Sequence, residues 1–526
     1  MIGVSAKLSE QEIVREFFEL FKTEWEFERP GVDYEVIIRS AADFGERSNA
    51  RLIIFYGADS CDASLLRNVR TVCRGNRMLL FKKDRLPIYG SCLSFSGSFD
   101  NQLIDEVTRE SVTIPLTQRE HQTVLWIGYD LWHEIRYLLV EGQPELYAGI
   151  PTLELHIGFL RGLLHQYNVE FAEVPPVPAG YKFIACLTHD VDHASIRAHK
   201  LDRTIAGFIY RAAIQSFFHF CSGRKSLADL LRNWTTVISL PLIQLGLLPD
   251  IWSRFEKYAE IEKTLPSTFF VVPRAGDSGR LREGGAAPKM RAVRYTQAKI
   301  SSQLRRLLRT GHEVALHGIN AWLTSTEANE ERVALQNGIG EADLPAIVGV
   351  RMHWLYYDRS APKALDQAGF HYDSTLGYNG TIGYRSGTCQ VYKAIGAERL
   401  KELPLHVMDT ALLFPSHMNL TTAEAKAKIG TLIANAVRFG GVLTINWHDR
   451  SIAPERLWHH LYTDIIAELR NAGAWFATAS QTVQWFEKRR AAKLRMSAGA
   501  TSGSTDDLPG LTIKNDLPLQ SVGVAA

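Results

Sequence analysis

Two aspartates and two histidines stand within five positions in the segment LTHDVDH, residues 187–193, directly after the apolar run FIAC. A buried carboxylate is costly unless a cation or hydrogen bonds compensate it, so such a cluster at a strand end is either a charge-paired loop or a metal site. Residues two apart on an extended chain point the same way, so Asp190 and Asp192 can face one cavity. One carboxylate could then hold a divalent metal while the other takes a proton from water.

Further acidic, basic and imidazole side chains follow other apolar segments. Taken singly, each has an ordinary structural explanation, because loop histidines are often solvated and aspartates often cap helices. A metal beside Asp192 would need about two more ligands, preferably imidazole. The residues at these segment ends are His317 in HEVALHG, Arg351 and His353 in GVRMHW, Asp409 in LPLHVMD, and His448 in NWHD. Among them His317 is the best candidate for a second ligand.

In their order along the chain, LTHDVDH, GHEVALHG, GVRMHW, ELPLHVMD and LTINWH resemble the motifs of the polysaccharide deacetylase, or NodB-homology, family of carbohydrate esterases. The resemblance covers roughly residues 181–490. It is especially close to a subset that carries YDSTLGY, residues 372–378, followed by RSGTC, residues 385–389. It implies a deformed (β/α) barrel and the metal-dependent hydrolysis of N- or O-acetyl groups on sugars.

The resemblance also implies a role for each motif residue. These roles are general base for Asp190, metal ligand for Asp192 and His317, orientation of the base for Arg351, general acid for His448, and orientation of a neighbouring group for Asp409. The chemistry agrees with them, because a guanidinium beside Asp190 keeps that carboxylate ionised and an amine leaves only when it is protonated.

One position departs from the family pattern. The family usually places a second histidine four residues after the first, and here that position is Ala321, which cannot bind a metal. His353 replaces the proline of the family's RxPW motif and is our preferred third ligand, with contact to substrate in a groove as the alternative. Zinc is the expected cation for an Asp/His set, although cobalt, nickel and manganese accept the same donors.

Aromatic residues crowd the same segments, and aromatic faces stack on sugar rings. From this group we expect Trp354, Tyr378 and Trp447 to bind substrate, with ordinary packing in the barrel core as the alternative for most of them. We expect Cys186 to be a buried core thiol.

The elements that would position these residues are apolar runs, each followed by a helical segment. Such alternation predicts a parallel sheet layered by helices, with the site at the carboxyl ends of the strands. The predicted strands are residues 181–187, 267–273, 312–318, 345–354 and 440–448, and a predicted helix covers residues 297–311.

The rest of the sequence predicts an accessory domain, a linker and a tail outside this barrel. Residues 1–168 read as an N-terminal α/β accessory domain of unknown role, with strands at 34–38, 51–57 and 124–130 and an amphipathic helix over the first 21 residues. The proline-rich stretch 169–180 reads as a linker to a deacetylase-like domain at 181–490. Residues 491–526 have few large apolar side chains, which predicts a disordered tail.

Residues 194–265 interrupt the alternation with apolar helical material. The runs 204–221 and 237–252 are each shorter than the roughly 20 residues that a bilayer span requires. Core or capping helices are the favoured interpretation. The alternative is peripheral membrane contact through residues 204–252.

Net charge, cysteine content and the N-terminal sequence limit the binding partners and the cellular compartment that we expect for the protein. A formal net charge of +2 predicts no nucleic-acid binding. The six cysteines form no CxxC pair, and the N-terminus lacks the apolar core of a signal peptide, so we expect a cytoplasmic protein.

The leading hypothesis is a hydrolase of carbon–nitrogen bonds that removes an acetyl group from an N-acetylated sugar, glycan precursor or glycolipid. One alternative keeps the fold and cleaves a small non-sugar amide. Another is a non-catalytic barrel that binds saccharide. The presence of Asp190, Asp192, Arg351 and His448 together argues against the last, because a binding module needs no paired acid and base.

Overall fold

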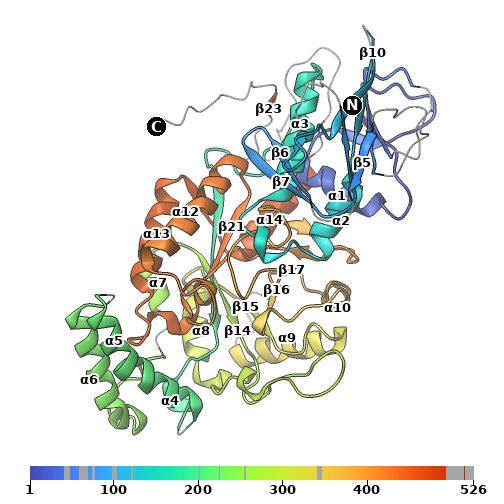
Figure 1. Ribbon diagram of the computed structural model, residues 1–526. Coiled ribbons are helices and arrows are strands. Elements are labelled where there is room, and N and C mark those ends of the chain that lie inside the picture. The colour runs from blue at the N-terminus through green and yellow to red at the C-terminus, as the bar shows by residue number, and fades with distance from the viewer. Residues whose placement is uncertain are drawn as a thin grey trace. The chain divides into compact units, whose positions relative to one another are not determined.

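The computed structural model describes most of the chain (Figure 1). The described residues are 1–40, 48–58, 69–73, 77–96, 103–119, 122–200, 202–223, 225–253, 256–340, 346–492, 494 and 514–515. The chain divides into two compact units. Unit 1 comprises Met1–Gly180, Tyr384–Ile395 and Trp485–Ala526, and unit 2 comprises Tyr181–Gly383 and Gly396–Gln484. The segment 384–395 lies inside the predicted limits of the deacetylase-like domain but groups with unit 1.

Unit 1 is built on a six-stranded sheet with strand order β10-β11-β4-β3-β1-β2. Its strands are parallel except for the antiparallel pair β10–β11. The predicted strands at 34–38, 51–57 and 124–130 are confirmed as β3, β4 and β11. The bounds are β1 Ile2–Val4, β2 Trp25–Phe27, β3 Val36–Ser40, β4 Leu52–Tyr56, β10 Thr113–Arg119 and β11 Gln122–Ile127.

The prediction of one helix over the first 21 residues is wrong at its start. Residues Ile2–Val4 form β1, which pairs with β2 on one side and β3 on the other. Two neighbouring strands satisfy its backbone and bury its side chains, which local periodicity could not reveal. The amphipathic helix α1 is present but spans only Gln11–Phe21.

The rest of unit 1 consists of helices and small sheets. Helix α3 carries Glu154, which accepts a hydrogen bond from the Thr388 hydroxyl at 2.6 Å and joins the segment 384–395 to this unit. The other elements are α2 Leu131–Val140, η2 Glu145–Tyr147, α3 Thr152–Gln166, the pair β5 Val69–Cys73 and β8 Cys92–Phe95, the sheet β7 Asp84–Ile88, β6 Arg77–Phe81 and β9 Leu103–Asp105, the pair β12 Ala172–Glu173 and β23 Lys514–Asn515, and β18 Tyr392–Lys393.

Unit 2 is built on a parallel sheet with strand order β19-β17-β16-β15-β14-β13-β21-β20. Strands β13, β14 and β21 are buried along their whole length, as expected for parallel strands covered on both faces. The bounds are β13 Phe183–Val191, β14 Ser267–Val271, β15 Glu313–Gly318, β16 Gly349–Met352, β17 Tyr372–Asp373, β19 Lys401–Glu402, β20 Val407–Met408 and β21 Val442–Asn446, with β22 Ala474–Phe476 paired to the start of β13.

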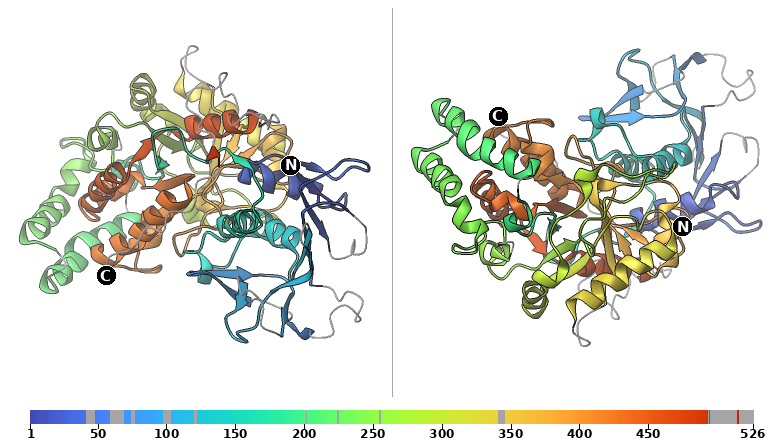
Figure 2. Two further views of the ribbon diagram at one scale, coloured as in Figure 1. Left: turned by 90° about the horizontal axis from the view of Figure 1, so that it is seen from above. Right: turned by 90° about the horizontal axis from the view of Figure 1, so that it is seen from below.

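Helices surround this curled sheet (Figures 1 and 2), so the predicted α/β fold, a deformed (β/α) barrel with an N-terminal α/β domain, is confirmed. The predicted helix at 297–311 is present as η6 Gln297–Lys299 followed by α8 Ser301–Arg309. The other helices are η5 Lys289–Arg291, α7 Lys257–Glu262, α9 Ser325–Ile339, η7 His353–Leu355, α10 Ala361–Gln367, α11 Asp409–Leu413, α12 Thr422–Phe439, η8 Asp449–Ile452 and α13 His459–Asn471. Helix α14 Ala479–Ala491 begins in unit 2 and ends in unit 1.

The predicted helical insertion lies between β13 and β14. It contains η3 Ile196–Ala198, the nearly continuous helices α4 Arg203–Ile209, η4 Tyr210–Gln215 and α5 Ser216–Cys221, and then α6 Leu227–Gln244. Within the described part of the chain, no helix has the length and apolar character to cross a membrane. The predicted disordered tail, 491–526, lies outside the described residues except for residues 491–492, 494 and 514–515.

Candidate active site

The end of β13 sends alternate side chains to opposite faces of the sheet. Asp190 and Asp192 share one face, as their spacing predicted. His189 points to the other face, where its Nε2 lies 2.7 Å from Glu262 Oε1 and its ring stacks on Tyr258. The first histidine of LTHDVDH is therefore a packing residue behind the sheet and has no part in the site.

Arg351 fixes the Asp190 carboxylate. The buried guanidinium donates from Nη1 to Asp190 Oδ1 at 2.9 Å, and Asn446 Nδ2 donates to Oδ2 at 2.8 Å. Burial raises the pKa of Asp190, but neighbouring positive charge, including that of Arg351, outweighs it and holds the pKa below its usual value. Asp190 is therefore an ionised carboxylate with both oxygens oriented, as a general base requires.

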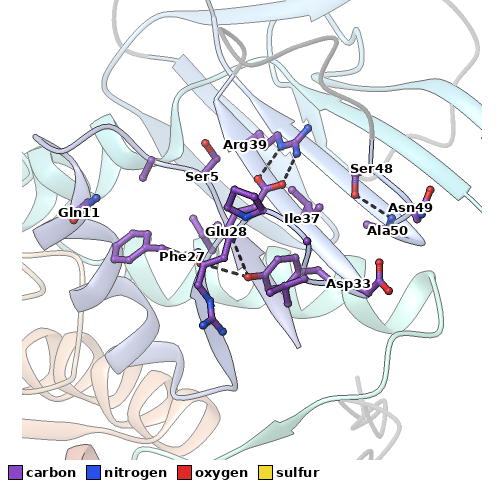
Figure 3. A pocket seen from close by; sticks show the side chains of 17 residues that line it. Ser5, Gln11, Phe27, Glu28, Asp33, Ile37, Arg39, Ser48, Asn49 and Ala50 are labelled. Atoms are coloured by element: carbon purple, nitrogen blue, oxygen red, sulfur yellow. Dashed lines mark hydrogen bonds and ion pairs between the residues drawn. The ribbon is translucent and has the colours of Figure 1, made fainter.

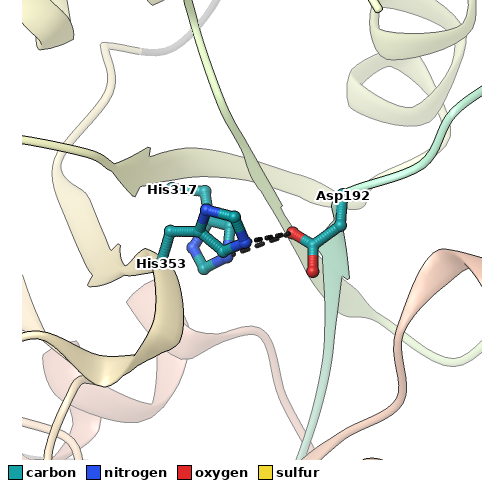
Figure 4. Close-up of side chains that lie close together, drawn as sticks. All are labelled: Asp192, His317 and His353. Carbon is teal, nitrogen blue, oxygen red and sulfur yellow. Dashed lines mark ion pairs between the residues drawn. The ribbon is translucent and has the colours of Figure 1, made fainter. Parts of the chain in front are cut away.

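Asp192, His317 and His353 form a cluster of donor atoms at the carboxyl ends of β13, β15 and β16 (Figure 4). Asp192 Oδ1 lies 3.4 Å from His317 Nε2 and 3.5 Å from His353 Nε2. His317 Nδ1 lies 2.9 Å from the carbonyl oxygen of Arg351, so this nitrogen donates its proton and Nε2 turns a lone pair toward Asp192.

These donors fit a divalent cation. Four tetrahedral ligands at about 2.0–2.2 Å from a metal stand about 3.3–3.6 Å apart. The two distances from Asp192 Oδ1 fall in that range. That oxygen is buried and accepts no hydrogen bond from any described residue, so it is an unsatisfied ligand atom. The three side chains could hold a metal ion, and their donor types do not decide which one.

The position of the missing second histidine is now explained. Ala321 is buried directly after β15 and offers no donor. His353 supplies the third donor instead, because β15 and β16 pair with His317 opposite Arg351, and the chain turns after Met352. Its ring lies 4.9 Å from that of His317, and burial lowers its pKa, which favours the neutral form that binds metals.

His448 and Asp409 form the opposite side of the site. His448 Nδ1 lies 2.6 Å from Asp409 Oδ1, and the backbone amide of His448 donates to Oδ2 at 2.8 Å. His448 Nε2 lies 3.9 Å from Asp192 Oδ2. Burial lowers the pKa of His448, but the carboxylates of Asp409, Asp192 and Asp190 raise it to about 9. His448 is thus held protonated, with Nε2 directed at the cluster.

No family model and no curated protein matches this sequence. Solved structures do match. They include candidate polysaccharide deacetylases, a family 4 carbohydrate esterase, an allantoinase and a 4-alpha-glucanotransferase.

A candidate polysaccharide deacetylase from Mycobacterium smegmatis is 20% identical over 62% of this chain and 99% of its own, with a TM-score of 0.35. PuuE allantoinase is 12% identical over 59% and 93%, with a TM-score of 0.35. The carbohydrate deacetylase Agd3 is 8% identical over 93% and 87%, with a TM-score of 0.34. The case for an activity therefore rests on the side-chain geometry.

Beside the cluster, Trp354 is an exposed aromatic side chain, as a substrate contact requires. The residue is 39% exposed, and its ring meets the ring of His353 edge-on at 6.0 Å. Its backbone has a positive φ of 62°, which is strained for a tryptophan. Tyr378 is buried, and its role as a substrate contact stays a prediction.

The prediction for Trp447 is not supported by its position. Its side chain is fully buried, and its ring stacks on Tyr462 of α13 at 5.2 Å. The alternation along the strand end explains this, because Asn446 faces Asp190 and the next side chain points to the opposite side. Trp447 is a core residue between sheet and helix.

Two residues that hold the site in place, Asn446 and Arg291, were not among the residues predicted from the sequence. Asn446 stands two positions before His448 in LTINWH, so the same alternation could have placed it on the site face. Arg291 could not have been found, because it belongs to no motif. Its buried guanidinium donates to the carbonyls of Ser278, Ile319 and His353 and ties together the loops that carry the ligands.

A separate cavity of about 640 Å³ lies in unit 1, where β1, β2 and β3 end (Figure 3). Two of its charged groups pair with each other, since Arg39 Nε donates to Glu28 Oε2 at 2.9 Å, and the Tyr34 hydroxyl donates to Glu26 outside the lining at 2.8 Å. None of the side chains that carry the predicted chemistry lines it.

Proposed function

We propose that unit 2 is a metal-dependent hydrolase that removes the acetyl group from an N-acetylated sugar, glycan precursor or glycolipid. The proposal rests on two residues beside the cluster of metal-ligand candidates that are held in complementary protonation states, one ready to accept a proton and one ready to donate it. Asp190 is held ionised next to Arg351, and His448 is held protonated by Asp409. A barrel that only binds saccharide has no need for either arrangement.

The cluster of Asp192, His317 and His353 would hold the cation, which we propose to be zinc. When bound, it would supply Lewis-acid stabilisation of the oxyanion that forms as water adds to the acetamide carbonyl.

Asp190 would accept the proton of the attacking water. Arg351 and Asn446 each donate a hydrogen bond to one oxygen of the Asp190 carboxylate. Each oxygen keeps a second lone pair that can accept a proton. Oδ2 is the oxygen on the side of the cluster, 3.7 Å from His317 Nε2, so it is the atom we assign to the proton. The two donors hold the base in place without blocking it.

His448 would give its Nε2 proton to the leaving nitrogen. Water adds to the carbonyl carbon, the carbon–nitrogen bond breaks, and the nitrogen leaves as a neutral amine with acetate as the second product. The Asp409 carboxylate stabilises the imidazolium before transfer and fixes its ring afterwards. Trp354 would provide an exposed face for the sugar ring.

The test is acetate release from N-acetylglucosamine oligosaccharides by the full chain reconstituted with zinc. Asp190→Asn and His448→Gln should each lower kcat by roughly 10²–10⁴-fold, the usual contribution of a proton-transfer group. His417→Gln is the matched control, because His417 is exposed and outside the site.

The same assay separates the alternatives. Turnover of a small cyclic amide without turnover of sugar would contradict the proposal and favour the non-sugar amide hydrolase. Binding of the oligosaccharide in calorimetry, with no acetate released at any metal concentration, would favour the non-catalytic barrel.

A further inference from the structure

The helical insertion carries an unusual concentration of exposed apolar side chains. In the described part of the chain, 23 large apolar side chains are exposed, and 13 of them lie between Ile209 and Leu248. A typical soluble surface scatters such residues singly. We define this group as the apolar face of the insertion: Ile209, Tyr210, Ile214, Phe217, Phe218, Leu227, Leu231, Trp234, Ile238, Leu242, Leu245, Leu247 and Leu248.

The spacing shows that this face is built by helix geometry. Along α6 and its C-cap residue Leu245, the exposed apolar residues recur from Leu227 at intervals of four, three, four, four and three, which is one side of a helix. The opposite side of α6 is also apolar, and it is buried through Leu230, Leu240 and Ile243. This helix therefore has one face packed on protein and a second apolar face whose side chains are exposed.

The apolar stripe of α6 continues across to the helix before it. Phe217 of α5 stacks on Trp234 of α6 with ring centroids 6.4 Å apart, and both side chains are exposed. Behind them, Asn233 Nδ2 donates to Ser216 Oγ at 2.7 Å. Figures 1 and 2 show α5 and α6 side by side. The two helices present a single continuous surface.

Basic residues outnumber acidic ones in the sequence that carries this surface. Residues 203–248 contain five lysine or arginine residues and one acidic residue, Asp229. Arg203 and Arg232 are exposed. Tyrosine and tryptophan on the face suit the boundary between water and lipid, where their rings are half apolar and half polar. This combination complements an anionic bilayer, whose surface attracts basic residues while its acyl region takes up apolar ones.

We propose that the insertion docks unit 2 on the surface of an anionic lipid bilayer, with α5 and α6 lying flat on it. No described helix can cross a membrane, so the contact is peripheral. The base of the insertion is fixed to the candidate site, because Asp250 accepts from Ser195 Oγ at 2.6 Å, and Arg450 lies 4.1 Å above the ring of Trp252. Ser195 and Arg450 closely follow Asp192 and His448, so docking would anchor the loops next to the proposed metal site.

The test is co-sedimentation of the full chain with vesicles of phosphatidylcholine alone and of phosphatidylcholine mixed in equal parts with phosphatidylglycerol. We expect binding to the mixed vesicles that weakens as salt is added. Phe218→Ser with Ile238→Ser should lower the partition coefficient by roughly 10-fold or more. Both side chains are highly exposed, at 63% and 79%, so these changes should leave the fold intact.

Two further variants sharpen the result. Arg203→Gln with Arg232→Gln should lower binding to the mixed vesicles by roughly 5-fold for each charge removed. Met290→Ser with Val333→Ser changes exposed apolar residues of unit 2 outside the insertion and should bind like the unmodified chain. Circular dichroism and thermal melting check that every variant is folded.

The proposal is overturned if the unmodified chain binds neither kind of vesicle, or if the Phe218 and Ile238 variant binds as well as the unmodified chain. It is also overturned if light scattering finds a dimer that this variant converts to a monomer while no vesicle binding is seen. The apolar face would then be an interface between two copies. None of these readouts depends on hydrolysis.

Discussion

Single side chains decide whether a metal can be held at all. Asp192 Oδ1 is the atom that both histidines approach, and it has no other described hydrogen-bonding partner. His317 is oriented by a backbone carbonyl, which no substitution can remove without moving the strand. The cluster therefore depends on its three ligand side chains.

The first prediction concerns metal content. Asp192→Ala and His353→Ala should each lower the affinity for zinc by more than the roughly 10–100-fold that a partner outside the metal's own ligands contributes. Metal retained after gel filtration, measured by inductively coupled plasma mass spectrometry, checks this, with His417→Ala as control. If His353→Ala keeps its metal while Asp192→Ala loses it, His353 is a groove residue and the third ligand is another group.

The second prediction concerns pH. The folded-state pKa of His448 is raised to about 9, so the general acid keeps its proton at neutral pH and activity should fall as pH rises through that value. A bound cation offsets the negative charge of Asp192 and so lowers the pKa of His448. The alkaline limb of the pH–activity profile of the metal-loaded enzyme should therefore lie below pH 9.

Asp409→Asn removes the largest charge that raises this pKa, so its alkaline limb should lie at lower pH than that of the unmodified enzyme. The measurement is kcat/KM against pH. Asp464→Asn is the control, because it removes an exposed carboxylate that pairs with Lys426. Identical limbs in the Asp409 variant and the unmodified enzyme would exclude His448 as the titrating acid.

At the scale of elements, strand β16 is placed by close packing as well as by hydrogen bonds. Gly349 begins the strand that carries Arg351, and a Cβ atom there would lie 1.9 Å from the ring of Tyr372. Tyr372 is fully buried, and its hydroxyl donates to Glu313 of β15 at 2.8 Å. The ring cannot move aside without breaking that contact.

The third prediction follows from this packing. Gly349→Ala should lower the free energy of unfolding by roughly 1–3 kcal/mol, the usual cost of overpacking a core. Gly430→Ala is the matched control. Gly430 lies inside α12 with nothing within 4 Å of its Cβ position, so alanine there should stabilise the protein by roughly 0.5–1 kcal/mol. Chemical denaturation measures both, and equal effects would contradict the packing argument.

At the scale of the whole chain, unit 2 is not one continuous segment. Residues 384–395 leave it and pack within unit 1, where the Leu153 amide donates to the Gly387 carbonyl at 2.8 Å and Thr388 donates to Glu154. A chain cut down to residues 181–490 would keep this segment without its partners.

The fourth prediction is that such a truncated chain becomes sensitive to trypsin at Arg385 and Lys393. The intact chain should resist cleavage there, because buried side chains such as Ser386 and Tyr392 hold the segment in place. Mass spectrometry of the fragments locates the cuts. A truncated chain that resists trypsin as well as the intact one would show that the segment needs no contacts from unit 1.

The sequence by itself determined which strand-end side chains share a face and meet at one edge of the sheet. A strand has a period of two, so the spacing within LTHDVDH is enough to place Asp190 and Asp192 on one face. Parallel strands end at one edge, so the positions of His317, Arg351 and His448 at predicted strand ends predicted that they would meet these aspartates. Both inferences hold because they depend only on geometry along a strand and on the direction of the strands.

Only the tertiary structure decided which atoms meet across strands. The third donor is His353 because the register of β15 and β16 and the turn after Met352 bring its ring to Asp192, and spacing along the chain does not encode that distance. The same holds for Arg291, which gathers three loops, and for the apolar face of the insertion. Periodicity shows that a helix has an apolar side, but only packing shows whether another element covers it.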